Sequence, residues 1–187
     1  MKFINIIMFV IGIISLSSCA SFKKSELAEN QIYLTNENLN LINGTYKNNE
    51  SKGSFPLEYF WGSFYKMKEY KSVYELVHKK KVPYFITLKV LNENNLKVEI
   101  KVEDIILKSY VIKGKVKNGY FEQNRKMYII PAIMLNSYHS SKFRIGYLKD
   151  NNIITDFKKI EFGTVYIFSP FSDSEKINNL VQKRISE

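Results

Sequence analysis

The chain is poor in the residues that build special sites, with one cysteine, two histidines and one tryptophan among its 187 residues. A single thiol cannot close an internal disulfide, and with two imidazoles it is too little for the usual Cys/His zinc sites. Disulfide-rich scaffolds and zinc fingers are therefore excluded. Catalytic motifs are missing too: there is no Gly-x-Ser-x-Gly, no His-Glu-x-x-His, no phosphate-binding loop and no acidic calcium loop. These absences predict no metal ion and no cofactor, and they make an enzyme the less favoured interpretation.

Charge is unbalanced, because 28 Lys and Arg stand against 18 Asp and Glu and leave a formal net charge of +10. With 45% hydrophobic and 25% charged residues, the composition is that of an ordinary foldable domain. The length suits one such domain and is short for two. The excess of positive charge favours anionic partners.

The N-terminus has the layout of a secretory leader, in which a basic residue precedes an apolar run, residues 3–16. A membrane-spanning helix needs about 20 apolar residues, so this run reads poorly as one. The motif Leu16-Ser17-Ser18-Cys19 closes the run and resembles the lipobox of bacterial lipoproteins, in which an aliphatic residue and two small residues precede the acylated cysteine. The resemblance implies that Cys19 becomes the mature N-terminus and that its acyl chains hold the protein on membrane lipid.

The residues after the cysteine bear on location. In Gram-negative lipoproteins an acid directly after the cysteine commonly means inner-membrane retention, and Ala20-Ser21-Phe22 contains none. By that resemblance the outer membrane is favoured, with the domain facing the periplasm. Anionic envelope components are then the available partners. Nucleic acid is not expected there, and no RNA-binding pattern is present.

Three segments are predicted: residues 1–18 as the leader, 19–40 as the lipidated N-terminus with a flexible tether, and 41–187 as one domain. In that domain, short runs of β-branched and aromatic residues are separated by Asn, Gly and Asp clusters, which is typical of consecutive antiparallel strands. The sequence predicts about nine strands. They are residues 41–46, 84–91, 96–103, 105–116, 120–123, 127–130, 142–148, 153–157 and 160–168.

The clearest strand is residues 96–103, where apolar and charged residues alternate without exception. Val98 should therefore face the core, with the charged residues in water. Polar residues at 92–95 and 150–152 predict tight connections, and Asn118-Gly119 suits the positive φ values of a type I′ turn. The expected fold class is mainly β, as a single antiparallel β-barrel or sandwich.

The C-terminal segment, residues 173–185, is predicted to be an amphipathic helix lying on the sheet. Residues 172–175 have the pattern of a capping box. The apolar residues that follow at helical spacing are Ile177, Leu180, Val181 and Ile185.

Gly44-Thr45-Tyr46 opens the first strand of the meander. This arrangement resembles the lipocalins (calycins), in which Gly-x-aromatic stands at the start of a barrel, although Tyr46 stands where that family usually has Trp. The resemblance implies a carrier of an apolar small molecule and assigns no pocket residues. The alternative is a glycine that permits a turn before a strand.

An aromatic cluster is the candidate ligand-binding site, because Tyr and Trp join a large hydrophobic body to one polar group. The same side chains can equally fill an ordinary core. The cluster consists of Phe55, Tyr59, Phe60, Trp61, Phe64 and Tyr65.

Two polar patterns remain. Lys113, Lys115 and Lys117 alternate along a strand, so neighbours lie about 6.6 Å apart on one side and can bind an anion, or can instead protect an edge strand. His139 lies among hydroxyl residues but without a nucleophile elbow or orienting acid, which favours a loop histidine. The sequence thus favours a non-enzymatic, lipid-anchored binding module, with a carrier of an apolar small molecule and an envelope enzyme as alternatives.

Overall fold

The computed structural model describes residues 22, 27–47, 84–124, 126–131, 135–166 and 168–185. In these residues the chain forms strands and one short 3-10 helix, so the mainly β prediction is confirmed. The elements are β1 (Gln31–Ile32), η1 (Leu39–Ile42), β2 (Gly44–Lys47), β3 (Phe85–Asn92), β4 (Asn95–Val102), β5 (Ile105–Lys117), β6 (Tyr120–Gln123), β7 (Lys126–Pro131), β8 (Leu135–Leu148), β9 (Ile153–Val165) and β10 (Ser169–Gln182).

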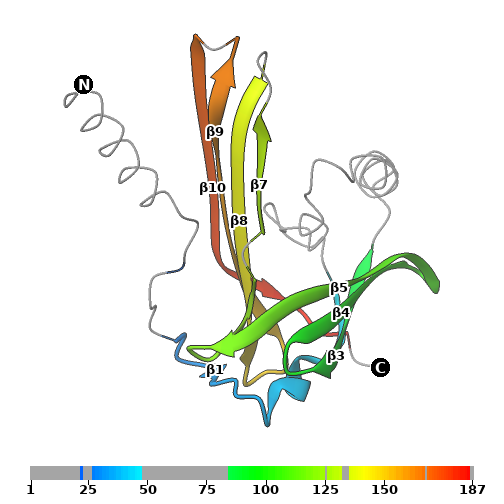
Figure 1. Cartoon of the computed structure of the whole chain (residues 1–187). Coiled ribbons are helices and arrows are strands. Elements are labelled where there is room, and N and C mark those ends of the chain that lie inside the picture. The colour runs from blue at the N-terminus through cyan, green and yellow to red at the C-terminus, as the bar shows by residue number, and fades with distance from the viewer. Residues whose placement is uncertain are drawn as a thin grey trace.

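All the described strands belong to one antiparallel sheet of order β10-β9-β8-β6-β5-β4-β3-β2 (Figure 1). β8 pairs with β9 along one edge, while β7, β6 and β1 pair with successive parts of its other edge. The sheet is not closed into a barrel. Beyond the end of β10, one isolated bridge joins Arg184 to Tyr46 of β2.

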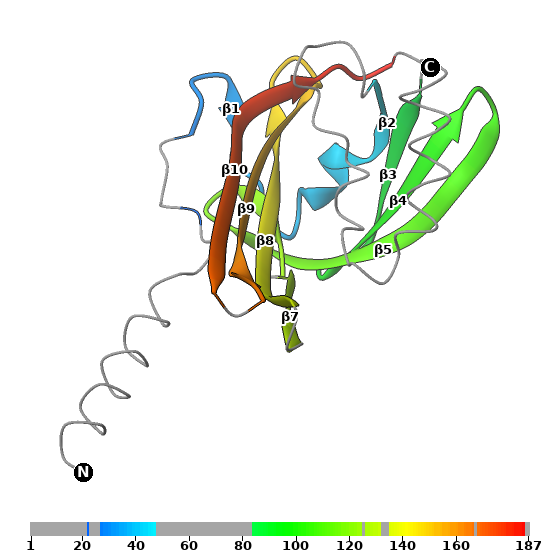
Figure 2. The ribbon, with the colours of Figure 1, turned by 90° about the horizontal axis from the view of Figure 1, so that it is seen from above.

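The sheet bends along β5, because this strand changes its partner. Its residues 105–113 pair with β4, and its residues 114–117 pair with β6. A Cβ atom on Gly114 would lie 2.6 Å from the carbonyl oxygen of Glu122 and 2.7 Å from the ring of Phe121, so the change of partner requires glycine. Figure 2 shows the two resulting walls, β8 to β10 and β3 to β5, with η1 between them.

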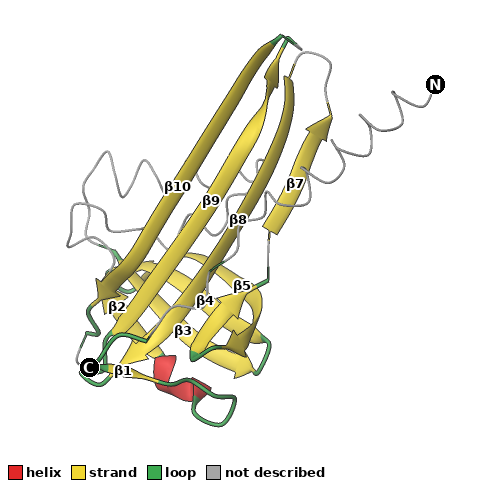
Figure 3. Cartoon of the chain, turned by 90° about the vertical axis from the view of Figure 1, so that its left-hand side faces the viewer, coloured by secondary structure: helices red, strands yellow, loops and turns green. Residues whose placement is uncertain are grey.

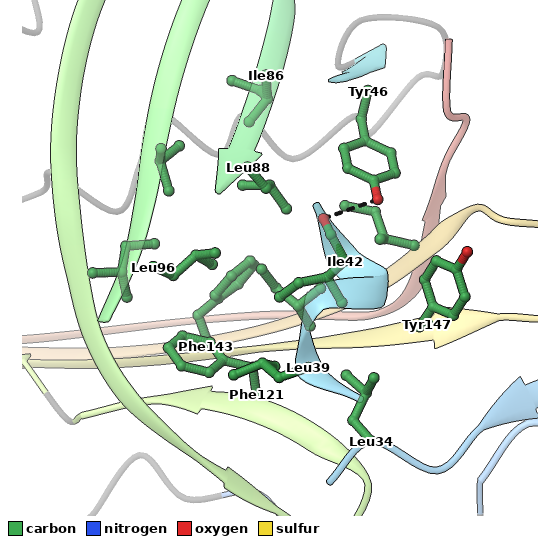
Figure 4. Close-up of a cluster of buried hydrophobic side chains, with 14 of the residues drawn as sticks. Leu34, Leu39, Ile42, Tyr46, Ile86, Leu88, Leu96, Phe121, Phe143 and Tyr147 are labelled. Carbon is green, nitrogen blue, oxygen red and sulfur yellow. Dashed lines mark hydrogen bonds between the residues drawn. The ribbon is translucent and has the colours of Figure 1, made fainter. Parts of the chain in front are cut away.

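The hydrophobic core lies between these walls. Alternate residues of the strands point inward, and Val98 is fully buried as predicted. η1 contributes Leu39 and Ile42, and the hydroxyl of Tyr46 donates a hydrogen bond of 3.0 Å to the carbonyl oxygen of Ile42 (Figure 4). Other buried members of the core include Leu34, Ile86, Leu88, Leu96, Ile100, Phe121, Phe143, Ile145, Tyr147 and Phe157.

Three hairpins turn where the sequence predicts, and one of them joins β8 to β9 through residues 149–152. Asn92 pairs with Asn95 at the end of the β3–β4 ladder. Between β5 and β6, Asn118 and Gly119 have φ values of 52° and 79°, the two positive angles that a type I′ turn requires.

Residues 27–40, which the sequence assigns to the tether, take part in the fold. β1 pairs with β8, and both Leu34 and Leu39 are buried in the core. The folded region therefore begins before residue 41. Leu34 and Leu39 are isolated apolar residues in a polar segment and show no periodicity. The sequence pattern therefore does not reveal that they are buried.

The predicted C-terminal helix is wrong, because residues 169–182 form β10 and pair with β9. A β-bulge lies between Ile177 and Leu180, and Asn179 within it has a φ of 55°. The bulge adds a residue to one strand, so Ile177 and Leu180 pack against the same core although they are three positions apart. Spacing that resembles a helix here marks an irregular strand.

β8, β9 and β10 continue well beyond the core, and β7 joins them there (Figures 1 and 3). We call this region the arm. It comprises β7, residues 135–142, residues 158–166 and residues 168–176. No described residue of the arm belongs to a buried hydrophobic cluster, whereas Phe143 and Phe157 at its base do. The arm is thus a four-stranded sheet with little apolar burial to support it.

Candidate functional site

The sheet has a core face and an outer face, and strand register separates them. Lys115 lies opposite Glu122, which lies opposite Arg144 on β8. Arg144 in turn lies opposite Asp156 on β9. Directly opposed residues of an antiparallel pair share a face, so this charged row marks the outer face across four strands. The same register extends it over β4, β3 and β2.

Cations gather on the outer face and far outnumber its carboxylates. Glu99 is held between Lys97 at 2.6 Å and Lys101 at 3.5 Å, and the hydrogen bond from Lys97 lowers the pKa of the Glu99 carboxyl. The carboxylates of this face are Glu99, Glu122 and Asp156, and its cations are Lys47, Lys89, Lys97, Lys101, Lys113, Lys115, Lys117, Lys142, Arg144, Lys158 and Lys176.

The predicted lysine stripe lies on this face. Lys113, Lys115 and Lys117 are exposed, while the intervening Gly114 is buried and Val116 is half-buried. One-sided display, as the alternation predicts, is therefore observed. Lys113 lies where β5 pairs with β4, and Lys115 and Lys117 lie where it pairs with β6.

Two ion pairs on the outer face are buried. Arg144 Nε lies 2.5 Å from Asp156 Oδ2, and Asp156 also accepts a hydrogen bond of 2.7 Å from the backbone N–H of Asn179. The guanidinium of Arg144 sits 4.1 Å from the ring centroid of Tyr120 and 4.6 Å from that of Phe22. Lys142 contacts Glu122. These contacts engage Glu122 and Asp156, whereas Lys113, Lys115 and Lys117 remain exposed on the same face.

At the base of the arm the outer face carries a lysine row. Lys142 lies opposite Lys158, and Lys158 lies opposite Lys176 on the next strand. Like charges directly opposite one another destabilise a sheet. Lys142 is compensated by Glu122, so the countercharge for the other two lysines has to come from outside the row.

Beyond the lysine row, the outer face of the arm becomes apolar. Met127 and Ile129 of β7 are each 57% exposed, and Phe162 of β9 is 38% exposed. Tyr138 stacks on Phe162 with ring centroids 4.7 Å apart. At the end of the arm Tyr166 and Phe168 are 63% and 88% exposed, so large apolar surface is offered to a partner.

The opposite face of the arm is mostly acidic. Glu161 lies opposite Asp173, and Glu175 lies opposite Lys159. Lys159 Nζ contacts Glu161 at 2.9 Å and Asp173 at 3.7 Å. The arm therefore has a basic and apolar outer face, whereas its reverse face carries three acids together with Lys159 and the exposed Val165.

His139 lies on this reverse face within a Ser-His-Glu contact. Its Nε2 lies 2.9 Å from Ser137 Oγ, and its Nδ1 lies 3.3 Å from Glu161 Oε1. Burial lowers the pKa of His139, against the opposing effect of the Glu161 carboxylate. The neutral imidazole then donates from Nδ1 to Glu161 and accepts from the hydroxyl of Ser137. The prediction of a loop histidine without an orienting acid is therefore wrong, because His139 lies in β8 and register brings Glu161 of the neighbouring strand to it.

The contact set does not make Ser137 a good nucleophile. Ser137 is only 2% exposed, and its strand pairs on both sides, with Ile130 and with Gly163. Its neighbouring backbone N–H groups belong to sheet ladders and are not available to stabilise an oxyanion. The arrangement fits a structural hydrogen-bonded cluster better than an acyl-transfer site.

A shallow polar cleft of about 400 Å³ lies where the chain returns to β2. Gly44, Thr45, Asn152 and Arg184 are among its lining residues. Arg184 donates a hydrogen bond of 2.8 Å to the carbonyl oxygen of Asn43. Gly44 thus opens β2 beside a guanidinium, and Tyr46 of the same motif belongs to the core.

The predicted aromatic cluster, from Phe55 to Tyr65, lies outside the described residues. In the described part of the chain no helix is long and apolar enough to cross a membrane. Nor do the described residues bring together three or more His, Cys, Asp or Glu side chains that suit a metal ion. Comparison with protein-family models, with curated proteins and with solved structures gives no match.

Proposed function

We propose that the chain is a lipid-anchored protein of a bacterial cell envelope whose domain binds an anionic envelope component without catalysis. The lipobox supports the anchor, and the absence of an acid after Cys19 supports the outer membrane with the domain facing the periplasm. The uneven distribution of charge over the sheet supports the binding role.

The observation that carries this proposal is the outer face itself. Its acids are engaged in ion pairs, whereas Lys113, Lys115 and Lys117 are exposed side by side. A surface with charge of one sign raises the local concentration of an oppositely charged polymer or headgroup. Such attraction weakens as salt screens it.

The test of the binding role is a charge reversal with a matched control. The acylated chain in phosphatidylcholine vesicles is titrated with dextran sulfate as a polyanion probe. The double variant Lys113→Glu, Lys115→Glu should bind the probe more weakly than the double variant Lys149→Glu, Lys183→Glu, which changes the net charge equally at exposed positions elsewhere. Equal weakening by both variants would reduce the effect to net charge and overturn the assignment of this surface.

The anchor is tested separately. Cys19→Ala should leave an unprocessed precursor that incorporates no labelled fatty acid, whereas Ser21→Ala should be acylated normally. Acyl labelling of the Cys19→Ala variant would contradict the lipoprotein assignment.

The alternative role, a lipocalin-like carrier of an apolar molecule, gains less support. In the described residues the space between the two walls is occupied by core side chains such as Leu39, Phe121 and Phe143. The binding role on the outer face is therefore the better supported one.

A further inference from the structure

We infer that the arm lies on an anionic lipid bilayer through its outer face, with Tyr166 and Phe168 embedded at the level of the interface. This inference rests on the proposed function in one respect, the acylation of Cys19. It goes beyond that function by naming a second contact and the chemistry of its partner.

The exposed side chains change from basic to apolar toward the free end of the arm. The lysine row is followed toward the free end by Met127, Ile129 and Phe162, and then by Tyr166 and Phe168, all substantially exposed. Strands rise about 3.3 Å per residue, so Phe162 lies about 13 Å and Tyr166 about 26 Å beyond Lys158. An arm lying at a shallow angle can therefore place lysines at headgroup phosphates and its end among acyl chains.

The charges on the two faces of the arm also favour contact through the outer face. Lys158 faces Lys142 and Lys176 directly, and a phosphate above the row supplies the countercharge that the sheet lacks. The described charged side chains of the reverse face are three acids, Glu161, Asp173 and Glu175, and Lys159, so an anionic surface repels this face. The outer face therefore approaches such a bilayer more favourably, and the charges orient the arm.

Phe22, which follows the acylated Cys19 closely in the sequence, lies on the outer face of the sheet. Phe22 packs on Arg144, which lies on the outer face next to the lysine row. Two residues lie between Cys19 and Phe22, and an extended chain spans at most about 11 Å over these three steps. A bilayer that holds the acyl chains of Cys19 can therefore lie close to the outer face of the sheet.

The depth of the contact follows from the strand edges. β7 and β10 each have one edge unpaired within the described part of the arm, and unpaired backbone groups do not enter the hydrocarbon region. The arm therefore stays interfacial, with apolar side chains reaching about 5–10 Å below the headgroups.

A second copy of the chain is a poorer occupant. Among described residues the outer face of the arm holds no carboxylate, so an identical face brings another lysine row and no complementary charge. A bilayer containing phosphatidylglycerol supplies both the phosphates and the apolar layer.

The test places a fluorescent reporter at the end of the arm in the full acylated chain. Phe168→Trp is reconstituted in vesicles of phosphatidylcholine and phosphatidylglycerol, with or without bromine on the acyl chains. The matched control is Ile106→Trp, because Ile106 is also exposed, at 50%, but lies at the far end of β5. After subtraction of the wild-type signal of Trp61, bromine should reduce the fluorescence of Phe168→Trp and leave Ile106→Trp nearly unchanged.

A second set of measurements tests the charge, with Lys158 and Lys176 both replaced by Glu in the Phe168→Trp chain. This change should weaken quenching, and omission of phosphatidylglycerol should do the same. Equal quenching of Phe168→Trp and Ile106→Trp would overturn the inference. So would quenching that follows the protein-to-lipid ratio, which would assign the arm to a second copy.

Failure here is distinguishable from failure of the proposed function. Dextran sulfate binding depends on Lys113 and Lys115, neither of which is changed in the reporter chains. If that binding persists while the end of the arm stays unquenched, only the inference about the arm is lost.

Discussion

The long strands β8, β9 and β10 run through both the arm and the body of the sheet, which is the part that contains the core. The two faces of these strands are covered differently in the two regions. In the body, Phe143 and Phe157 are buried on one face while Arg144 and Asp156 form a buried ion pair on the other. In the arm the register continues unchanged, but no described residue joins a hydrophobic cluster.

This difference shows that the alternation of residue types places side chains on two faces of a sheet. It does not determine which elements cover each face. In the body, η1 and the opposite wall cover the core face. In the arm the same alternation places the lysine row on the outer face, and Glu161, Asp173 and Glu175 on the reverse face. Because burial supplies most of the stability of a fold, the arm is free to carry residues selected for binding.

The largest expected effect tests the two faces of the body. Val98→Asp places a carboxylate in the core and should cost about 4 kcal/mol, a large part of the about 5–15 kcal/mol stability of a domain. Val111→Asp is the same substitution on the outer face, where Val111 is 49% exposed, and should stay within about 0.5 kcal/mol. Urea midpoints measure both, and equal losses would mean that both faces are buried.

The next effect compares an ion pair of the body with one of the arm. Asp156→Asn removes the carboxylate that pairs with the buried guanidinium of Arg144 and should destabilise the fold by about 3 kcal/mol. Glu161→Gln breaks the more exposed pair with Lys159 and should cost less than about 1 kcal/mol. Thermal unfolding of the two variants ranks them, and the reverse order would contradict the distinction between body and arm.

A smaller effect on the unfolding free energy is expected when pH is lowered, because His139 of the arm then takes up a proton. Burial holds the pKa of His139 below its ordinary value of 6.5, so the unfolded chain takes up a proton more readily than the folded one. The stability that neutral His139 provides is thus present above pH 6.5 and is lost as pH falls through the lowered pKa. Unfolding free energies measured from pH 7 to 5.5 should fall less steeply for His139→Gln than for wild type. Parallel slopes would show that His139 is not coupled to folding.

The smallest effect on stability is expected at the end of the arm. Phe168 is 88% exposed, so Phe168→Ser should change the unfolding free energy by less than about 0.5 kcal/mol. A loss comparable to that of a core substitution would show that Phe168 is buried in the folded protein. The comparison between body and arm would then fail at its far end.

The strands were largely predictable, and the errors have physical causes. Residues 96–103 alternate cleanly because they have one buried and one wet face throughout. β10 escaped prediction because its exposed part lacks an apolar face and its bulge mimics helical spacing. The 3-10 helix η1 interrupts residues predicted as a strand, since tertiary contacts of Leu39 and Ile42 outweigh local preference.

The binding surface was predictable only in part. The stripe from Lys113 to Lys117 is visible in the sequence because its members lie on one strand. The lysine row is invisible there, because Lys142, Lys158 and Lys176 meet only through the pairing of three strands. The contact of His139 with Glu161 is hidden for the same reason.

The sequence by itself determined the mainly β class, the three predicted hairpin turns, the one-sided lysine stripe and the excess of positive charge, because these follow from local patterns and composition. The tertiary structure decided the strand order, the bend at Gly114, the open sheet and the arm. It also decided which charges share a face. Such properties depend on register between segments far apart in the chain, and a difference of one residue in register moves every side chain to the other face.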